Sequence, residues 1–210
     1  MIRILIADDH AIVREGLKQI IADTTDIVVA GEASNGQEVL NKVSENGYDL
    51  LLLDITMPDK NGVDILKEVK KKRPGLHILI LSIHPEEQYA VRVLKAGASG
   101  YLTKESAPDE LVTAIRKVAL GGKYISPSLA EKLASDLETD SEKPLYQILS
   151  DREYQVMCMI ASGKTVKEIA KELLLGTKTI NTYRSRIMQK TKMRNNMELT
   201  RYVVENQLLD

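Results

Sequence analysis

The stretch Tyr48-Asp49-Leu50-Leu51-Leu52-Leu53-Asp54 places four consecutive leucines directly before an acidic residue. A short, continuous apolar run of this kind is typical of a strand that is covered on both faces of a sheet. Similar runs at residues 2–7 and 76–81 end at the acidic pair Asp8-Asp9 and at Ser82. Open α/β sheets bind ligands at the carboxyl ends of their strands, so we expect these polar side chains to meet at one edge.

Amphipathic stretches separate the apolar runs over the first 120 residues. In the first of them, apolar residues recur at i, i+4, i+7 and i+8, which is one face of a helix. We expect strands near 2–7, 27–33, 49–53, 76–81 and 99–102, and helices near 11–23, 35–46, 62–73, 86–97 and 107–120. Five successive strand–helix units predict an α/β domain with a five-stranded, parallel, doubly wound (flavodoxin-like) sheet.

The chain after this pattern changes character. Residues 135–143 are polar and acidic, and Pro144 follows them. Such a segment is typical of a linker between domains. We therefore predict a first domain over 1–121, a linker over 122–146 with a short helix near 127–135, and a second domain over 147–210.

The last 60 residues carry helix signals and no strand signal. Ser150-Asp151-Arg152-Glu153 is a capping box, which predicts a helix from residue 150 to about 161. Apolar spacing predicts a second helix around 166–173, and two more follow near 177–190 and 195–206. A helix, a tight turn and a basic second helix are the arrangement of proteins that read the DNA major groove.

Composition and charge narrow the class of protein. The 210 residues include one cysteine, Cys158, which excludes a disulfide framework and predicts a cytoplasmic protein. No apolar run approaches the roughly 20 residues of a membrane span, so we expect no membrane partner. Residues 149–210 hold 11 basic and 7 acidic residues, whereas residues 1–120 hold 15 and 18. A basic final third predicts a polyanion as its partner.

The acidic residues at the sheet edge predict a reactive site. Three carboxylates repel one another unless a cation neutralises them, and oxygen ligands suit Mg²⁺. Asp54 would then act as a nucleophile that forms an aspartyl phosphate, with Lys104 offsetting the phosphoryl charge and Ser82 hydrogen-bonding a phosphoryl oxygen. His10 and His84 are isolated histidines, so we do not predict them as metal ligands and expect them to shape loops.

With these residues in place, the first 120 residues resemble the receiver domain of response regulators in two-component signalling. The matching pieces are Ile6-Ala7-Asp8-Asp9-His10, Asp54-Ile55-Thr56-Met57-Pro58 with Gly62, Leu81-Ser82 and Gly100-Tyr101-Leu102-Thr103-Lys104. The resemblance implies that Asp54 is the phosphoacceptor. It implies Mg²⁺ bound by Asp8, Asp9, Asp54 and the backbone oxygen of Thr56. It also implies that Ser82 and Tyr101 are the switch pair and that Lys104 contacts the phosphoryl group.

The expected helix near 177–190 has two chemically different faces. Ile180, Tyr183 and Ile187 cluster on one face and predict packing against a scaffold helix. The other face carries hydrogen-bonding groups and no acid, as entry into a DNA groove requires. We expect DNA contacts from Lys178, Asn181, Thr182, Arg184, Ser185, Arg186 and Lys190. Asn and Lys can read base edges, whereas Arg184, Arg186 and Lys190 are better suited to phosphates.

The second domain resembles the helix-turn-helix of LuxR-type regulators. The shared pattern includes Leu149-Ser150-x-Arg152-Glu153, Gly163-Lys164, Lys167-Glu168-Ile169-Ala170 and Arg186-Ile187. Asn181, Tyr183 and Gly176 depart from residues common in that family. The whole chain is thus similar to NarL/FixJ-class response regulators. That class implies phosphorylation by a sensor histidine kinase, double-stranded DNA as ligand, and a homodimer in the phosphorylated or DNA-bound state, paired through residues 195–206.

Three other functions remain open at this point. In one, the chain is a DNA-binding regulator independent of phosphorylation, and its receiver is a structural dimerisation module. In another, it is a phosphatase or phosphotransferase acting on small esters, but Thr56 stands where such enzymes usually carry a second Asp. In the third, the output is protein binding. We predict no enzyme activity beyond the receiver's own phosphoryl transfer and dephosphorylation.

Overall fold

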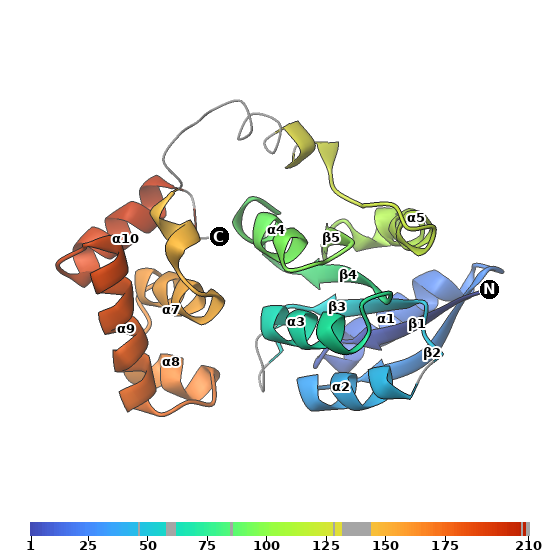
Figure 1. The fold of residues 1–210 in the computed structure, drawn as a ribbon, viewed down its shortest axis with the longest axis horizontal. Coiled ribbons are helices and arrows are strands. Elements are labelled where there is room, and N and C mark those ends of the chain that lie inside the picture. The colour runs from blue at the N-terminus through green and yellow to red at the C-terminus, as the bar shows by residue number, and fades with distance from the viewer. Residues whose placement is uncertain are drawn as a thin grey trace. The chain divides into compact units, whose positions relative to one another are not determined.

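The computed structural model describes residues 1–45, 47–57, 62–84, 86–127, 129–131, 144–206 and 208. The chain divides into two compact units, Met1–Ser135 and Asp136–Asp210, and each is described by itself (Figure 1). Of the helices in the described ranges, none combines the length and apolar character needed to cross a bilayer.

The first unit is built on a five-stranded parallel sheet with the order β2-β1-β3-β4-β5. Its strands are β1 (Ile2–Ala7), β2 (Ile27–Ala33), β3 (Leu50–Asp54), β4 (His77–Ser82) and β5 (Gly100–Thr103). The predicted fold class is confirmed. The last three strands end one residue later than predicted, because the backbones of Asp54 and Ser82 still pair with Leu81 and Thr103 although their side chains are polar.

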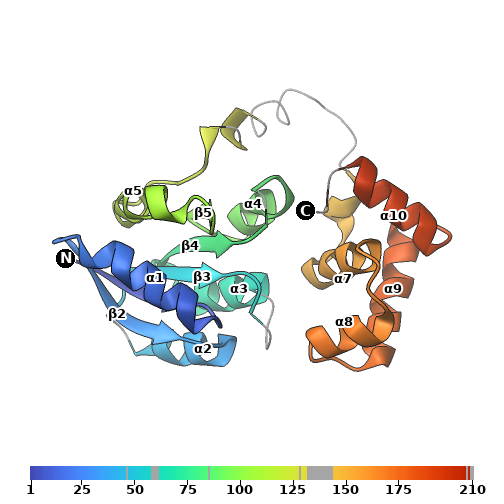
Figure 2. The same cartoon turned by 180° about the vertical axis from the view of Figure 1, so that it is seen from behind.

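Helices cover both faces of this sheet (Figures 1 and 2). They are α1 (Ala11–Ala22), α2 (Gly36–Ser44), α3 (Gly62–Lys72), α4 (Glu86–Lys95) and α5 (Ala107–Ala119). Leu17 of α1 and Leu111 of α5 belong to one apolar core with alternate strand residues such as Ile4, Leu52 and Leu81. The right-handed crossovers place α2, α3 and α4 on the opposite face. The carboxyl ends of β1 and β3, between which the strand order reverses, are thereby left open at one edge.

The second unit is helical. It comprises the 3₁₀ helix η1 (Leu145–Ile148) and the α-helices α7 (Asp151–Ala161), α8 (Val166–Glu172), α9 (Thr177–Thr191) and α10 (Asn196–Glu205). The four predicted helices are confirmed, whereas η1 was not predicted. Ser150 and Glu153 form the expected capping box, and Thr165 and Glu168 form a second one. Ile169, Ile180, Ile187 and Leu199 are fully buried and form the core between the helices.

The segment after α5 lies on the sheet. The chain turns at Gly121, which has a φ of +85°, and Tyr124 then forms a parallel bridge with Gly100 of β5. Residues 127 and 129–131 are helical, whereas residues 132–143 lie outside the described part of the chain. Most of the helix predicted near 127–135, and the centre of the predicted linker, therefore cannot be compared. The boundaries at 121/122 and 146/147 stay predictions.

Candidate functional site

The acidic residues meet at the carboxyl edge of the sheet. Asp8 follows β1 and Asp54 ends β3, and each residue is only 1% exposed. Asp8, Asp9, His10 and Asp54 each offer one ligand atom, and these atoms lie within 4.8 Å of one another. The cluster lies at the point where strand order reverses, which is where doubly wound sheets bind ligands.

Lys104 joins the two buried carboxylates. Its Nζ lies 2.7 Å from Asp8 Oδ2 and 2.8 Å from Asp54 Oδ2. Burial lowers the pKa of Lys104, but the charges and hydrogen bonds of Asp54 and Asp8 outweigh burial and raise it on balance. The lysine is therefore a fixed positive charge between two carboxylates.

Thr56 contacts Asp54 through its backbone N–H and its hydroxyl, which the sequence pattern does not single out. Its backbone N–H donates to Asp54 Oδ1 at 2.9 Å, and its hydroxyl donates to the same oxygen at 2.7 Å. The two oxygens of Asp54 are thus held separately, one by Thr56 and one by Lys104. These bonds hold the Asp54 carboxylate in one orientation.

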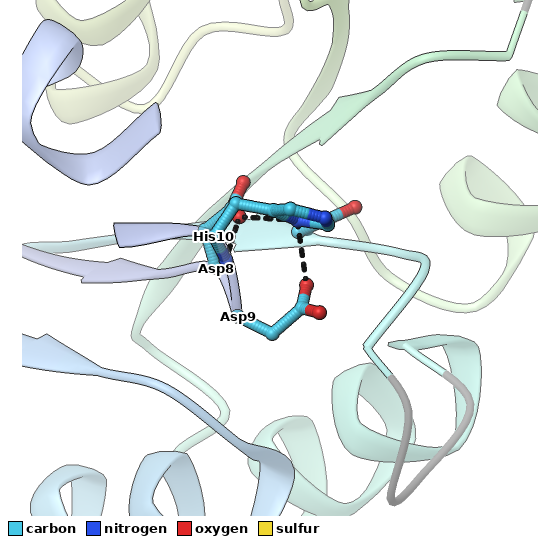
Figure 3. A group of neighbouring side chains, drawn as sticks. Asp8, Asp9 and His10 are labelled. Atoms are coloured by element: carbon cyan, nitrogen blue, oxygen red, sulfur yellow. Dashed lines mark hydrogen bonds and ion pairs between the residues drawn. The ribbon is translucent and has the colours of Figure 1, made fainter. Parts of the chain in front are cut away.

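His10 lies closer to the acidic residues than its isolation in the sequence indicated. Figure 3 shows its ring beside Asp8 and Asp9, with Nδ1 at 3.4 Å from Asp8 Oδ1 and 3.1 Å from Asp9 Oδ1. Its backbone N–H also donates to Asp8 Oδ1 at 2.8 Å. The sequence indicated only a loop residue, because a histidine adjacent to two acids is a common surface pattern whose direction the sequence does not give. The side chain is 62% exposed.

The carboxylates fit a metal ion. Asp9 Oδ1 is buried and accepts no hydrogen bond from the described residues, although His10 Nδ1 lies 3.1 Å from it, and Asp8 Oδ2 lies 2.7 Å from the Lys104 ammonium. Buried carboxylate oxygens are normally satisfied, because leaving one without a donor or a cation is unfavourable. An oxygen donor set with an open, solvent-facing side suits a hard divalent cation of the Mg²⁺ type.

Ser82 and Tyr101 are both fully buried and meet at a third residue. The Ser82 hydroxyl accepts a hydrogen bond from the His84 N–H at 3.0 Å. The Tyr101 hydroxyl donates to the His84 carbonyl at 2.7 Å. The structure thus connects the two predicted switch residues through the backbone of His84, a connection that local sequence patterns do not indicate.

In the second unit, the two faces of α9 are as predicted. Ile180 and Ile187 are fully buried, and Tyr183 is half-buried beside them. The opposite face is exposed and carries Lys178, Asn181, Thr182, Ser185 and Arg186. Arg184 is half-buried, and its Nε donates to Asn196 Oδ1 at 2.8 Å. This bond orients the guanidinium beside the first turn of α10.

Lys190 differs from the other predicted DNA-contacting residues. Its Nζ lies 2.6 Å from Glu153 Oε2, and the Glu153 side chain is only 3% exposed. Burial raises the pKa of Glu153, but hydrogen bonds from Lys190 and from the Ser150 N–H outweigh it and hold the pKa below its usual value. Lys190 therefore holds α9 to α7, and the 41% of its side chain that is exposed is what remains for a DNA contact.

Two family models match the chain. The model of the response regulator receiver domain matches residues 4–116, which is more than half of the chain. The model of bacterial regulatory proteins of the luxR family matches residues 147–203. The chain is a response regulator. Its luxR-family domain and its relatives place it in the NarL/FixJ class of two-component transcription regulators, as the sequence resemblance predicted.

The response regulator resembles curated proteins over its whole length. It is 37% identical over 209 residues to the response regulator UvrY of Escherichia coli (strain K12), with 99% of this chain and 96% of UvrY covered. It is 34% identical over 211 residues to the response regulator GacA of Pseudomonas aeruginosa, with 100% and 99% covered. These matches run through both units.

Solved structures of the response regulator RcsB share the fold of both units. One from Salmonella typhimurium is 26% identical and matches with a TM-score of 0.71, covering 98% of each chain. Another, from Salmonella enterica serovar Typhimurium, is bound to the promoter rprA in the presence of the phosphomimetic BeF₃⁻. It is 27% identical with a TM-score of 0.67, and covers 97% of this chain and 99% of that one.

Proposed function

We propose that a sensor histidine kinase phosphorylates this response regulator on Asp54, and that the modification controls DNA binding by α9. The observation that carries the proposal is Lys104, held between the buried carboxylates of Asp8 and Asp54. A lysine held between carboxylates at a ligand-binding sheet edge can neutralise the charge of a phosphoryl group that one of the carboxylates accepts.

In this proposal, Asp8, Asp9, Asp54 and the backbone oxygen of Thr56 would hold Mg²⁺. When bound, the ion supplies positive charge that offsets the developing charge on the phosphoryl oxygens. The fit rests on the buried Asp9 Oδ1, which accepts no hydrogen bond from the described residues, and on the carboxylates of Asp8 and Asp54 that lie beside it.

The transfer uses groups of this chain in defined roles. A carboxylate oxygen of Asp54 attacks the phosphorus of a phosphohistidine, so a P–O bond forms as the P–N bond breaks and the electron pair returns to the kinase imidazole. The Thr56 N–H and hydroxyl hold Asp54 in place. The Lys104 ammonium, already 2.8 Å from Asp54 Oδ2, moves its contact onto a phosphoryl oxygen. Hydrolysis of the product by water is the other step that the receiver would promote.

The phosphoryl group would then recruit Ser82. Its hydroxyl is buried at the carboxyl end of β4, one residue beyond the partner of Asp54 in the ladder. Turning the hydroxyl toward a phosphoryl oxygen changes its bond to the His84 N–H, and His84 also holds Tyr101. In this way, phosphorylation of Asp54 would change the surface around α4 and β5.

The output in this proposal is sequence-specific binding of double-stranded DNA. The exposed face of α9 would enter the major groove, with Lys178, Asn181 and Thr182 near base edges and Arg184, Ser185 and Arg186 near phosphates. A homodimer paired through α10 would read two half-sites about one helical turn apart. The luxR-family match and the RcsB–promoter structure support this arrangement. The proposal assigns the protein to the cytoplasm, where kinase and DNA are both within reach.

Intact mass after treatment with acetyl phosphate tests the chemistry. We expect a single phosphoryl adduct that requires Mg²⁺ and is absent from Asp54→Ala. DNA affinity, measured on a selected binding site, should rise with the adduct in wild type and ignore phosphodonor in Asp54→Ala. A wild type that binds DNA tightly and never forms the adduct would instead support a phosphorylation-independent regulator.

A further inference from the structure

The segment that leaves α5 toward the second unit is fastened to the receiver. We call residues 123–131 the strap; residue 128 lies outside the described part of the chain. The Tyr124 N–H donates to the Ser99 carbonyl at 3.0 Å, and the Tyr101 N–H donates to the Tyr124 carbonyl at 3.1 Å. The strap therefore continues the hydrogen bonding of the sheet beyond β5, its last strand.

The sequence of β5 accommodates this contact. A Cβ atom on Gly100 would lie 2.6 Å from the Tyr124 carbonyl oxygen, well inside van der Waals contact. Gly100 is thus a position at which close approach of another backbone requires the absence of a side chain. That requirement identifies the strap as a built part of the receiver.

Side chains fasten the strap at two places. Near its start, Lys123 Nζ donates to the Ala98 carbonyl at 2.6 Å, and the Tyr124 hydroxyl donates to Glu110 Oε2 at 2.8 Å. Further along, the Ser126 hydroxyl donates to the carboxylate of Glu86, the first residue of α4. Leu129 is 1% exposed. One end of the strap is therefore held by β5 and α5, and the other by α4.

Three hydrogen bonds, linked through His84 and Tyr101, connect Ser82 at the proposed phosphorylation site with the strap. Ser82 binds the His84 N–H, the His84 carbonyl binds the Tyr101 hydroxyl, and the Tyr101 N–H binds Tyr124. Glu86 follows His84 by two residues and carries the second fastening. A movement of Ser82 toward Asp54 would act on His84, which precedes by two residues the Glu86 that holds the far end of the strap.

We propose that phosphorylation of Asp54 releases the strap from α4 at Ser126 while Tyr124 stays bound to β5, and so lengthens the free tether of the DNA-binding unit. The inference rests on the proposed function, because it needs the phosphorylated state. Six residues, 126–131, join the tether on release, and fully extended they add up to about 20 Å of reach. Two DNA-binding units on longer tethers can reach paired half-sites that short tethers deny them.

Hydrogen–deuterium exchange on the full chain tests the release. Three samples are compared: wild type with Mg²⁺, wild type with Mg²⁺ and beryllofluoride, and Asp54→Ala with both. We expect the amides of Ser126 and residues 129–131 to exchange about tenfold faster with beryllofluoride in wild type only, since local opening sets exchange rates. Amides of Tyr101 and Tyr124 should keep their protection.

A variant separates the strap from the chemistry. Ser126→Ala removes the bond to Glu86 and leaves the acidic site intact, with Glu45→Gln on the exposed end of α2 as the matched control. We expect Ser126→Ala to accept phosphate at the wild-type rate and to bind DNA severalfold more tightly without phosphodonor. The Glu45→Gln variant should behave as wild type in both assays.

The outcomes distinguish the two proposals. If the adduct forms and DNA affinity rises while exchange at 126–131 ignores beryllofluoride, the strap proposal is wrong and the proposed function stands. Equal DNA affinity of Ser126→Ala and wild type would likewise remove the regulatory role of the strap. If no adduct forms under any condition, the proposed function fails and the strap proposal fails with it.

Discussion

The ammonium group of Lys190 lies 2.6 Å from the Glu153 carboxylate and joins the last turn of α9 to the first turn of α7. Both charges complement the helix dipoles, because the lysine lies at a helix carboxyl end and the glutamate at a helix amino end. Glu153 also accepts the Ser150 N–H at 2.7 Å as part of the capping box. One carboxylate thus caps the scaffold helix and orients the helix proposed to read DNA.

Glu153→Ala should destabilise the second unit by about 2 kcal/mol, because it leaves the Ser150 N–H and Lys190 without their acceptor. Native-state hydrogen exchange of amides in α7 and α9 measures this loss without interference from the receiver. Glu205→Ala, which removes an exposed partner of Arg201, is the control and should change little. Unchanged protection of α9 in Glu153→Ala would show that the ion pair does not hold the helix.

Stability of the second unit should fall in acid through Glu153. Its pKa is lower in the folded state than in the unfolded chain, so unfolding takes up a proton as the pH drops. The stabilisation is complete above the ordinary pKa of about 4.3 and is lost as the pH falls through the lowered value. Exchange of α7 and α9 amides from pH 6 downward should reveal this dependence. In Glu153→Gln, the exchange of these amides should depend less on pH. The same pH dependence in the variant as in wild type would assign it to other carboxylates.

Lys104→Gln should reduce the rate of phosphorylation by acetyl phosphate at least tenfold, because it removes the charge that meets the phosphoryl oxygens. The same change leaves Asp8 and Asp54 unneutralised, so Mg²⁺ should raise the melting temperature of the receiver more in the variant than in wild type. Intact mass over time and thermal unfolding with and without Mg²⁺ measure the two effects. Lys71→Gln, at an exposed position of α3, is the control. A wild-type phosphorylation rate in Lys104→Gln would contradict its assigned role.

Two residues on the exposed face of α9 should affect DNA binding differently. Asn181→Ala should cost about 1–3 kcal/mol of discrimination between the operator and altered sites, since amides bind base edges. Arg186→Ala should weaken all DNA about equally and reduce the salt dependence of log K by roughly 0.9, because it removes one phosphate contact. Fluorescence anisotropy at several salt concentrations measures both. Lys171→Ala on α8 is a charge-matched control, and loss of discrimination in Arg186→Ala alone would reverse the two assignments.

Tyr124 should titrate above the ordinary pH range of a tyrosine. Burial and the hydrogen bond to Glu110 raise its pKa to about 12. Because the folded value lies above the unfolded one, the stabilisation is complete below the ordinary pKa of about 10 and is lost as the pH rises through 12. Ultraviolet titration compares wild type, which has eight tyrosines, with Tyr124→Phe. The variant should lack one late-titrating group. If the group that the variant lacks titrates near the ordinary pKa of about 10, Tyr124 does not hydrogen-bond to Glu110.

The parts of the fold that depend on local spacing could be predicted from the sequence. Apolar runs located the five strands, and the Ser150–Glu153 spacing located the start of α7. The convergence of Asp8, Asp54 and Lys104 followed from the rule that parallel strands end at one edge. These inferences need only a period or a spacing of a few residues.

Contacts between distant residues could not be predicted in this way. Glu153 and Lys190 are 37 residues apart, and a charge on a helix reads as solvated until its partner is known. The strap lies within the segment 122–146 that the sequence predicts as a linker, because the backbone contact of Tyr124 with β5 has no sequence pattern of its own. His10 was set aside because the sequence does not give the direction of its ring.

The contact between Gly100 and Tyr124 bears on how the receiver can be isolated. A fragment ending at residue 121 would uncover the amides and carbonyls along the outer side of β5, and such open margins pair with other chains and promote aggregation. A fragment that extends to residue 131 keeps this margin covered and retains the buried Leu129. If the fragment ending at residue 121 forms more dimers than the fragment ending at residue 131, the additional dimers would result from the truncation and not from signalling.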